Sequence, residues 1–214
     1  MLSDLTTTQP APNLPLPTEL GGTTVRVKDS AGVERLAPLF FVSPLQLNYQ
    51  IPAGTAPGAA TVILSNSGAQ QTGTIQVVAL RPSLFAANQN GQGVVAANVV
   101  RVQGDGTRSN GTTWQWDAGQ NQYVVQPIEL GPESDQVFLE LYGTGLRLHP
   151  SLNKVRAWLG GTEVEVLYAG SQQTFAGLDQ INVRLPRSLQ GRGEIDLVVI
   201  TAGKTSNPVR LNVR

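Results

Sequence analysis

The sequence has no cysteine, and it has only one histidine and one methionine among its 214 residues. The lack of cysteine excludes a disulfide scaffold, a zinc site with thiolate ligands and a thiol nucleophile. The single histidine, His149, argues against a metal site built from several imidazoles. No Gly-x-Ser-x-Gly motif is present either. We therefore predict no catalytic residues, no metal and no cofactor, and we predict that the protein is not an enzyme.

Charged residues are few and balanced. The 15 Lys and Arg residues match 15 Asp and Glu residues, and charged residues make up only 14% of the chain. Nucleic-acid binding needs a basic excess, and disordered chains usually carry a high net charge. No apolar run approaches the ~20 residues that cross a bilayer. These features predict a folded protein with no nucleic-acid partner and no membrane span.

The first twelve residues are rich in Thr and Pro, with no basic start and no apolar run. They lack the pattern of a secretory signal and are typical of a linker. Two interpretations follow: a cytoplasmic protein, or a piece of a longer exported protein. The abundance of Thr, Gln, Asn and Gly favours the second. We therefore expect an extracellular or cell-surface location as part of a longer precursor.

Short runs of β-branched and aromatic residues recur along the chain between turn signals, and almost no segment has helical spacing. Val209, Leu211 and Val213 alternate with polar residues, which predicts a strand with one face in the core. Asp105-Gly106 and Asn110-Gly111 are typical of tight turns. This pattern predicts an all-β protein, either a β-sandwich or a barrel. The expected strands are 23–27, 37–42, 45–51, 61–65, 74–80, 94–102, 113–116, 123–130, 136–142, 155–159, 163–168, 180–185, 195–201 and 209–213.

One sequence pattern, Gln-[Leu/Ile]-Asn-x-x-[Ile/Leu]-Pro, occurs twice. In both copies an aromatic-bearing strand precedes it, and a Gly turn and a hydrophobic strand follow it. The repeated order predicts an internal duplication. Each proline should end its strand because proline cannot donate a ladder hydrogen bond. The amide side chains form either a ligand platform or a polar surface that faces solvent or nearby backbone. The repeated residues are Gln46, Asn48 and Pro52, and Gln180, Asn182 and Pro186.

The duplication divides the chain into two predicted domains. The first covers residues 1–80 and the second covers residues 81–214, with a β-meander extension at about 94–130. Arg81-Pro82 is the expected hinge. Residues 81–135 could instead complete the first sandwich.

Several short motifs in the sequence resemble those of a known family. They include Phe41-Val42-Ser43-Pro44, Arg81-Pro82-Ser83-Leu84-Phe85, Leu141-Tyr142-Gly143-Thr144-Gly145-Leu146 and Ser206-Asn207-Pro208-Val209. Together they are similar to the uncharacterised C-terminal domain of secreted proteins of Solibacter and other acidobacteria. The resemblance implies tandem immunoglobulin-like domains, similar to the IPT/TIG type, at the end of an exported protein. It implies no activity.

The first copy departs from the family pattern. The strand at residues 141–146 precedes the second copy, whereas the first copy has no room for such a strand before it. Either the start of the chain is truncated, or the first domain lacks its first strand. In both cases we predict an exposed edge, which invites pairing with another chain or a homo-oligomer. Alternatively, residues 1–5 or 12–17 cover this edge.

Three aromatic residues form the main candidate binding feature. Trp114 and Trp116 flank Gln115, and Tyr123 lies across the expected turn. Coplanar rings of this kind stack on sugars, although alternating tryptophans also fill the core of small meanders.

We therefore predict a non-enzymatic extracellular module that acts as a spacer, an adhesive unit or a C-terminal attachment segment, with a protein or glycan partner at the cell surface. The alternative is a carbohydrate-binding accessory domain of an exported hydrolase. An intramolecular isopeptide bond from Lys154 or Lys204 is a further open question.

Overall fold

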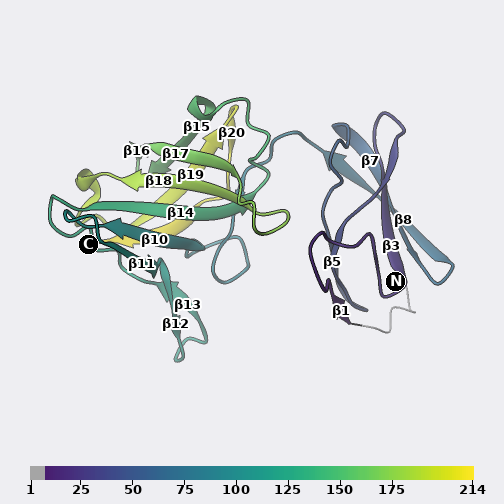
Figure 1. The fold of residues 1–214 in the computed structure, drawn as a ribbon, viewed down its shortest axis with the longest axis horizontal. Coiled ribbons are helices and arrows are strands. Elements are labelled where there is room, and N and C mark those ends of the chain that lie inside the picture. The colour runs from purple at the N-terminus through teal and green to yellow at the C-terminus, as the bar shows by residue number, and fades with distance from the viewer. Residues whose placement is uncertain (1–7) are drawn as a thin grey trace. The chain divides into compact units, whose positions relative to one another are not determined.

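A computed structural model describes residues 8–214 of the chain. They are built from β-strands and two single-turn 3₁₀ helices, η1 (Leu152–Lys154) and η2 (Arg187–Leu189). The fold is all-β, as the sequence pattern predicts (Figure 1). No helix in the described part of the chain is long and apolar enough to span a bilayer. The chain divides into two compact units, Met1–Ala79 (unit 1) and Leu80–Arg214 (unit 2).

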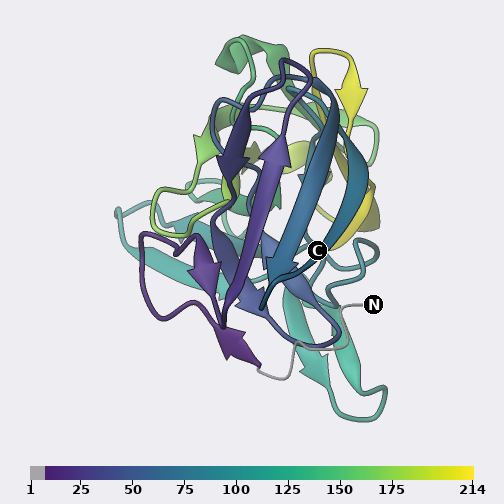
Figure 2. The same cartoon turned by 90° about the vertical axis from the view of Figure 1, so that its right-hand side faces the viewer.

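Unit 1 contains two antiparallel sheets. One has the order β1-β5-β6; the other has the order β2-β3-β7-β8, with β4 also paired to β3. The long strands β3, β7 and β8 run side by side (Figure 2). The strands are β1 (Gln9–Pro10), β2 (Glu19–Leu20), β3 (Thr23–Lys28), β4 (Glu34–Leu36), β5 (Leu39–Val42), β6 (Leu47–Tyr49), β7 (Gly58–Asn66) and β8 (Ala69–Val77).

The core of unit 1 lies between its two sheets. Val25 and Val27 of β3 are fully buried because alternate residues of a strand point to the same face. Leu39 and Val42 of β5 pack against them from the other sheet. The two sheets therefore form a small β-sandwich.

A buried ion pair orders the loops at one end of unit 1. The carboxylate of Asp29 accepts hydrogen bonds from the N–H groups of Ala31 and Val33 in the β3–β4 turn, at 3.0 and 2.9 Å. It also accepts one from the N–H of Ala56 at 3.0 Å, and it pairs with Arg35 at 2.6 Å. The hydrogen bond from Ala56 and the pairing with Arg35 outweigh the effect of burial and lower the pKa of Asp29 to about 2. One carboxylate thus joins two loops.

Unit 2 is larger. One sheet has the order β11-β10-β14-β18-β17, with β9 also paired to β14; another has the order β16-β15-β19-β20, with β21 also paired to β19; and β12 and β13 form a separate hairpin. The strands are β9 (Ser83–Leu84), β10 (Ala97–Val102), β11 (Arg108–Thr112), β12 (Trp114–Asp117), β13 (Gln122–Val125), β14 (Gln136–Thr144), β15 (Val155–Leu159), β16 (Thr162–Val164), β17 (Val166–Ser171), β18 (Asp179–Leu185), β19 (Gly193–Thr201), β20 (Lys204–Thr205) and β21 (Val209–Val213).

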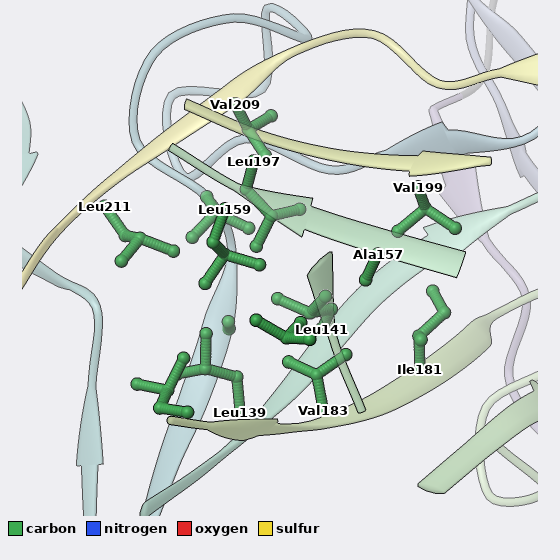
Figure 3. Packing of buried hydrophobic residues seen from close by; sticks show 14 of the residues in the cluster. Leu139, Leu141, Ala157, Leu159, Ile181, Val183, Leu197, Val199, Val209 and Leu211 are labelled. Carbon is green, nitrogen blue, oxygen red and sulfur yellow. The ribbon is translucent and has the colours of Figure 1, made fainter. Parts of the chain in front are cut away.

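Aliphatic side chains from two sheets meet in the core of unit 2 (Figure 3). Leu139 of β14 and Val183 of β18 point toward Leu159 of β15 and Leu197 of β19, and all four are fully buried. The alternation expected of the last strand is confirmed, since Val209, Leu211 and Val213 are fully buried. Each fully buried side chain of this size contributes about 1.5–3 kcal/mol, so this core is the main stabilising feature of the unit.

The segment predicted as a meander at about 94–130 is divided between two structures. Strands β10 and β11 extend the large sheet, and only β12 and β13 form a separate hairpin. The turn between β10 and β11 is at Asp105-Gly106, where Gly106 has a φ of +85°. The prediction of a turn at Asn110-Gly111 is wrong. Both residues lie inside β11, where they pair with Val100 and Val99 of β10.

The Gly143-Thr144-Gly145 motif at the end of β14 has a steric role. A Cβ atom on Gly143 would lie 2.2 Å from the carbonyl oxygen of Ser83, and one on Gly145 would lie 2.1 Å from that of Arg81. The N–H of Arg81 also donates to the carbonyl of Gly145 at 3.1 Å. The chain that enters unit 2 therefore runs directly against this segment.

The two units share their strand neighbours. In unit 1, β3 pairs with β4 and β7, and β5 pairs with β6; in unit 2, β15 pairs with β16 and β19, and β17 pairs with β18. The register shifts at the same place in both, between Leu39 and Phe41 of β5 and between Val166 and Tyr168 of β17. The repeated motif therefore lies in equivalent strands, β6 and β18.

Candidate functional site

A polar turn joins β12 and β13, which together form the aromatic hairpin. Oδ1 of Asp117 accepts hydrogen bonds from the N–H groups of Gly119 and Gln120, at 2.8 and 3.0 Å. The bond from Gln120 is the main cause that lowers the pKa of Asp117. This capped turn sets the register in which Trp116 pairs with Tyr123. The turn thereby brings aromatic residues of the two strands together.

The ring of Tyr123 contacts both indoles. Its centroid lies 4.8 Å from that of Trp114 and 5.1 Å from that of Trp116, with an interplanar angle of 72° in each case. These are edge-to-face contacts, which aromatic pairs favour. The three rings are therefore not coplanar. The stacking interpretation of the sequence assumed coplanar rings, and this part of it is wrong. Trp116 is 52% exposed, and neither indole belongs to the apolar core cluster of unit 2.

A polar groove of about 970 Å³ lies beside the hairpin. The loop at residues 88–94 and the strand β13 line two parts of it, and outward-facing residues of β19 and β21 line another. These outward-facing residues include Glu194, Asp196, Arg210 and Asn212. Arg210 and Asp196 form an exposed ion pair at 3.4 Å. Amide, carboxylate and guanidinium groups thus face solvent next to an aromatic residue, Tyr123, which also lines the groove.

Asn88 holds the hairpin against the groove. Its Oδ1 accepts a hydrogen bond from the N–H of Tyr123, and its Nδ2 donates one to the carbonyl of Tyr123, both at 2.8 Å. Asn207 fixes the other end of the loop, since its Nδ2 donates to the carbonyls of Leu84 and Gly91 at 3.0 and 2.7 Å. The wall of the groove is therefore held by side-chain amides together with backbone hydrogen bonds between residues 93–95 and Arg210 of β21.

Our sequence reasoning missed Asn88 and the groove. The signal in the sequence is the polar run Asn88–Gln92, which indicates only a turn. The partners of this run lie far along the chain, at Tyr123 and Asn207. No local pattern indicates contacts at such separations.

The repeated motif residues form one matched contact in each unit. Nε2 of Gln46 donates to Oδ1 of Asn48 at 2.9 Å, and Nε2 of Gln180 donates to Oδ1 of Asn182 at 2.8 Å. The two amides of each pair hydrogen-bond to each other, an arrangement that the sequence alternatives did not include.

The prolines of the motif begin turns. The carbonyl of Pro52 accepts the N–H of Thr55, and the carbonyl of Pro186 accepts the N–H of Leu189. Strand β18 ends directly before Pro186, as expected, whereas β6 already ends at Tyr49. The motif residues therefore have structural roles in both units.

An exposed ion pair holds Glu163. Glu163 binds Arg156 through two hydrogen bonds, which hold the pKa of Glu163 below its ordinary value. Within residues 8–214, no group of three or more Asp, Glu and His side chains is arranged to hold a metal ion. Lys154 and Lys204 both lie exposed on the surface. Among the described side chains, the hairpin and its groove are the strongest candidate for a binding site.

No protein-family model, curated protein or solved structure matches this chain.

Proposed function

We propose that the chain is a non-enzymatic extracellular module of a longer exported bacterial protein, built from two immunoglobulin-like β-sandwiches that arose by internal duplication. The shared strand neighbours and the matched Gln46–Asn48 and Gln180–Asn182 contacts support the duplication. Two small sandwiches in series suit a spacer or an adhesive unit, because rigid sheets present loops and edges at fixed positions. The complete open reading frame tests this: a secretion signal encoded upstream supports it, and a cytoplasmic catalytic domain encoded upstream contradicts it.

The adhesive role has a candidate ligand surface. The observation that carries it is the half-exposed indole of Trp116 on a hairpin whose Tyr123 lines a groove of polar side chains. A carbohydrate offers C–H faces that pack on an aromatic ring, and hydroxyls that bind amides and carboxylates. Carbohydrate is therefore the ligand class that this surface fits best.

Binding of the chain to a panel of bacterial and plant polysaccharides tests this surface. We expect Trp116→Ala to weaken binding by about tenfold or more, because the half-exposed indole is an apolar face that packs against Tyr123, which lines the groove. Phe175→Ala is the matched control, since Phe175 is an exposed aromatic residue that lies outside both the hairpin and the lining of the groove. The glycan proposal fails if no polysaccharide binds, or if both variants lose binding equally.

A further inference from the structure

In unit 2 the outer edge of β18 is covered by a neighbouring strand. β14 runs antiparallel to β18 over seven residue pairs, in which Leu141 lies opposite Ile181 and Leu139 lies opposite Val183. Ile181 and Val183 have no exposed surface. The strand β14 therefore closes this side of the sandwich.

In unit 1 the equivalent edge has no such strand. Among residues 8–214, β6 pairs only with β5, and the sheet ends there in the order β1-β5-β6. The segment at residues 12–17, one of the two expected covers, is held at β5 instead. The N–H of Ala11 donates to the carbonyl of Phe40, and the N–H of Leu39 donates to that of Pro17, so both ends of the segment are tied to adjacent residues of β5. The other expected cover, residues 1–5, lies outside the described residues.

The backbone of β6 is arranged to accept a further strand. The N–H of Gln50 donates to the carbonyl of Pro38 at 2.8 Å, as the equivalent Arg184 does to Glu165 at 3.0 Å. Alternate residues of a strand direct their N–H and C=O groups to opposite sides. The backbone groups of Leu47 and Tyr49 therefore point away from β5, toward the free edge.

The side chains at this edge are also less covered than their counterparts. Leu47 and Tyr49 are half-buried where Ile181 and Val183 are fully buried, and Ile51 is 37% exposed where Leu185 is 5% exposed. In the facing sheet, the side chains of unit 1 are likewise less buried than those of unit 2. Val62, Leu64, Ile75 and Val77 are half-buried, whereas the residues at matching positions are all fully buried, namely Leu197, Val199, Leu211 and Val213.

We propose that this open edge of unit 1, formed by Leu47, Tyr49, Val62, Leu64, Ile75 and Val77, binds an extended strand of a separate polypeptide. The strand runs antiparallel to β6 and carries aliphatic residues at alternate positions, as β14 does with Val137, Leu139 and Leu141. Main-chain hydrogen bonds to β6 supply affinity, and the alternate side chains fill the gap between the sheets.

A second copy of the chain fits the edge less well. Pairing β6 with β6 would join only three residues of each copy, whereas β14 pairs with β18 over seven. It would also insert only Leu47 and Tyr49 into the gap. The pattern of β14 is therefore the better description of the partner.

A labelled peptide with the sequence of residues 136–143, extended by two lysines for solubility, tests the proposal. We expect it to bind the full chain saturably with one site, as measured by fluorescence anisotropy. A control peptide with Leu139→Asn and Leu141→Asn should bind about tenfold more weakly or worse, because the alternate apolar side chains fill the gap. On binding, hydrogen exchange should slow at the N–H groups of Leu47 and Tyr49.

Variants of the chain locate the peptide. Leu47→Lys should abolish binding, whereas Phe175→Lys, at an exposed position in unit 2, should leave it unchanged. The exchange measurement also serves if Leu47→Lys does not fold. Unchanged binding by Leu47→Lys, equal binding of both peptides, or no saturable binding would overturn the proposal.

Two further outcomes would also overturn it. One is a dimer of the chain that excludes the peptide, which would assign the edge to a second copy. The other is peptide binding that occurs only after residues 1–7 are deleted, which would assign the edge to the chain's own N-terminal segment.

Discussion

Asn88 pairs with the backbone of Tyr123 as a neighbouring strand residue would, accepting from its N–H and donating to its carbonyl, both at 2.8 Å. The side chain of Asn207 pairs with Leu84 in the same way. It accepts from the N–H of Leu84 at 2.8 Å and donates to the carbonyl of Leu84 at 3.0 Å. The same residue type thus closes β-ladders at two places where no strand is available. An amide can do this because it carries a donor and an acceptor at nearly the spacing of a peptide group.

Substituting Asn88 should therefore loosen the aromatic hairpin. Asn88→Ala removes both hydrogen bonds and leaves the backbone groups of Tyr123 to solvent, which should cost about 1–3 kcal/mol of local stability. We expect a weaker near-ultraviolet circular dichroism signal from the packed rings. Hydrogen exchange at the Tyr123 N–H should also accelerate. Asn90→Ala is the control because Asn90 contacts only its own loop, through Gln92. An unchanged aromatic signal in Asn88→Ala would contradict this role.

Unit 1 should lose stability in acid through Asp29. The folded-state pKa is about 2, below the ordinary value of 3.8, because the N–H of Ala56 and the guanidinium of Arg35 favour the ionised form. A lowered folded-state pKa means that this stabilisation is fully present above the ordinary value and is lost as the pH falls from 3.8 to about 2. Calorimetry of Asp29→Asn should show a lower Tm for unit 1 at pH 7.

The difference in Tm between Asp29→Asn and the original chain should shrink across the same pH range. All three tryptophans, Trp114, Trp116 and Trp158, lie in unit 2, so tryptophan fluorescence identifies the transition of that unit and calorimetry supplies the other. Asp105→Asn, in an exposed turn of unit 2, should leave the unit 1 transition unchanged. A pH-independent difference would show that the Asp29 charge does not stabilise the unit.

Gly145 should not tolerate a side chain. Its φ of +76° disfavours any L-residue, and a Cβ atom would meet the carbonyl oxygen of Arg81 at 2.1 Å. We expect Gly145→Ala to destabilise unit 2 by about 2–4 kcal/mol, as measured by urea unfolding followed by tryptophan fluorescence. Gly106→Ala separates the two causes, because Gly106 has a φ of +85° with nothing within 4 Å. Equal losses in both variants would mean that the close approach of Arg81 has no effect.

The local pattern of the sequence predicts the fold class and many of the strands, because burial on one face imposes a period of two on the side chains. The strand Val209–Val213 is the clearest case, since its three apolar residues are all buried. Strand β11 (Arg108–Thr112) is the opposite case. It has no apolar alternation and it forms because β10 offers five residue pairs across a tight turn. Pairing of this kind overrides local propensity.

The candidate site could be predicted only in part. Trp114, Trp116 and Tyr123 are recognisable because they lie close together in the sequence around one turn. The groove beside them joins residues 88–94, 120–125 and 194–212, which only the sheet topology brings together. The edge-to-face geometry of the rings also depends on rotamers, which a sequence pattern does not specify.

The two units provide a matched pair of substitutions for the open edge. Leu47 and Ile181 hold equivalent positions in β6 and β18, but within residues 8–214 a further strand covers Ile181 and none covers Leu47. Ile181→Ala should therefore destabilise unit 2 by about 2–5 kcal/mol, since it leaves a cavity in a closed core. Leu47→Ala should destabilise unit 1 by about 1–2 kcal/mol, because that side chain is only half-buried. Calorimetry with tryptophan fluorescence resolves the two transitions. If Leu47→Ala costs as much as Ile181→Ala, the edge of β6 is already covered in the free protein, and the space proposed for a partner strand is not there.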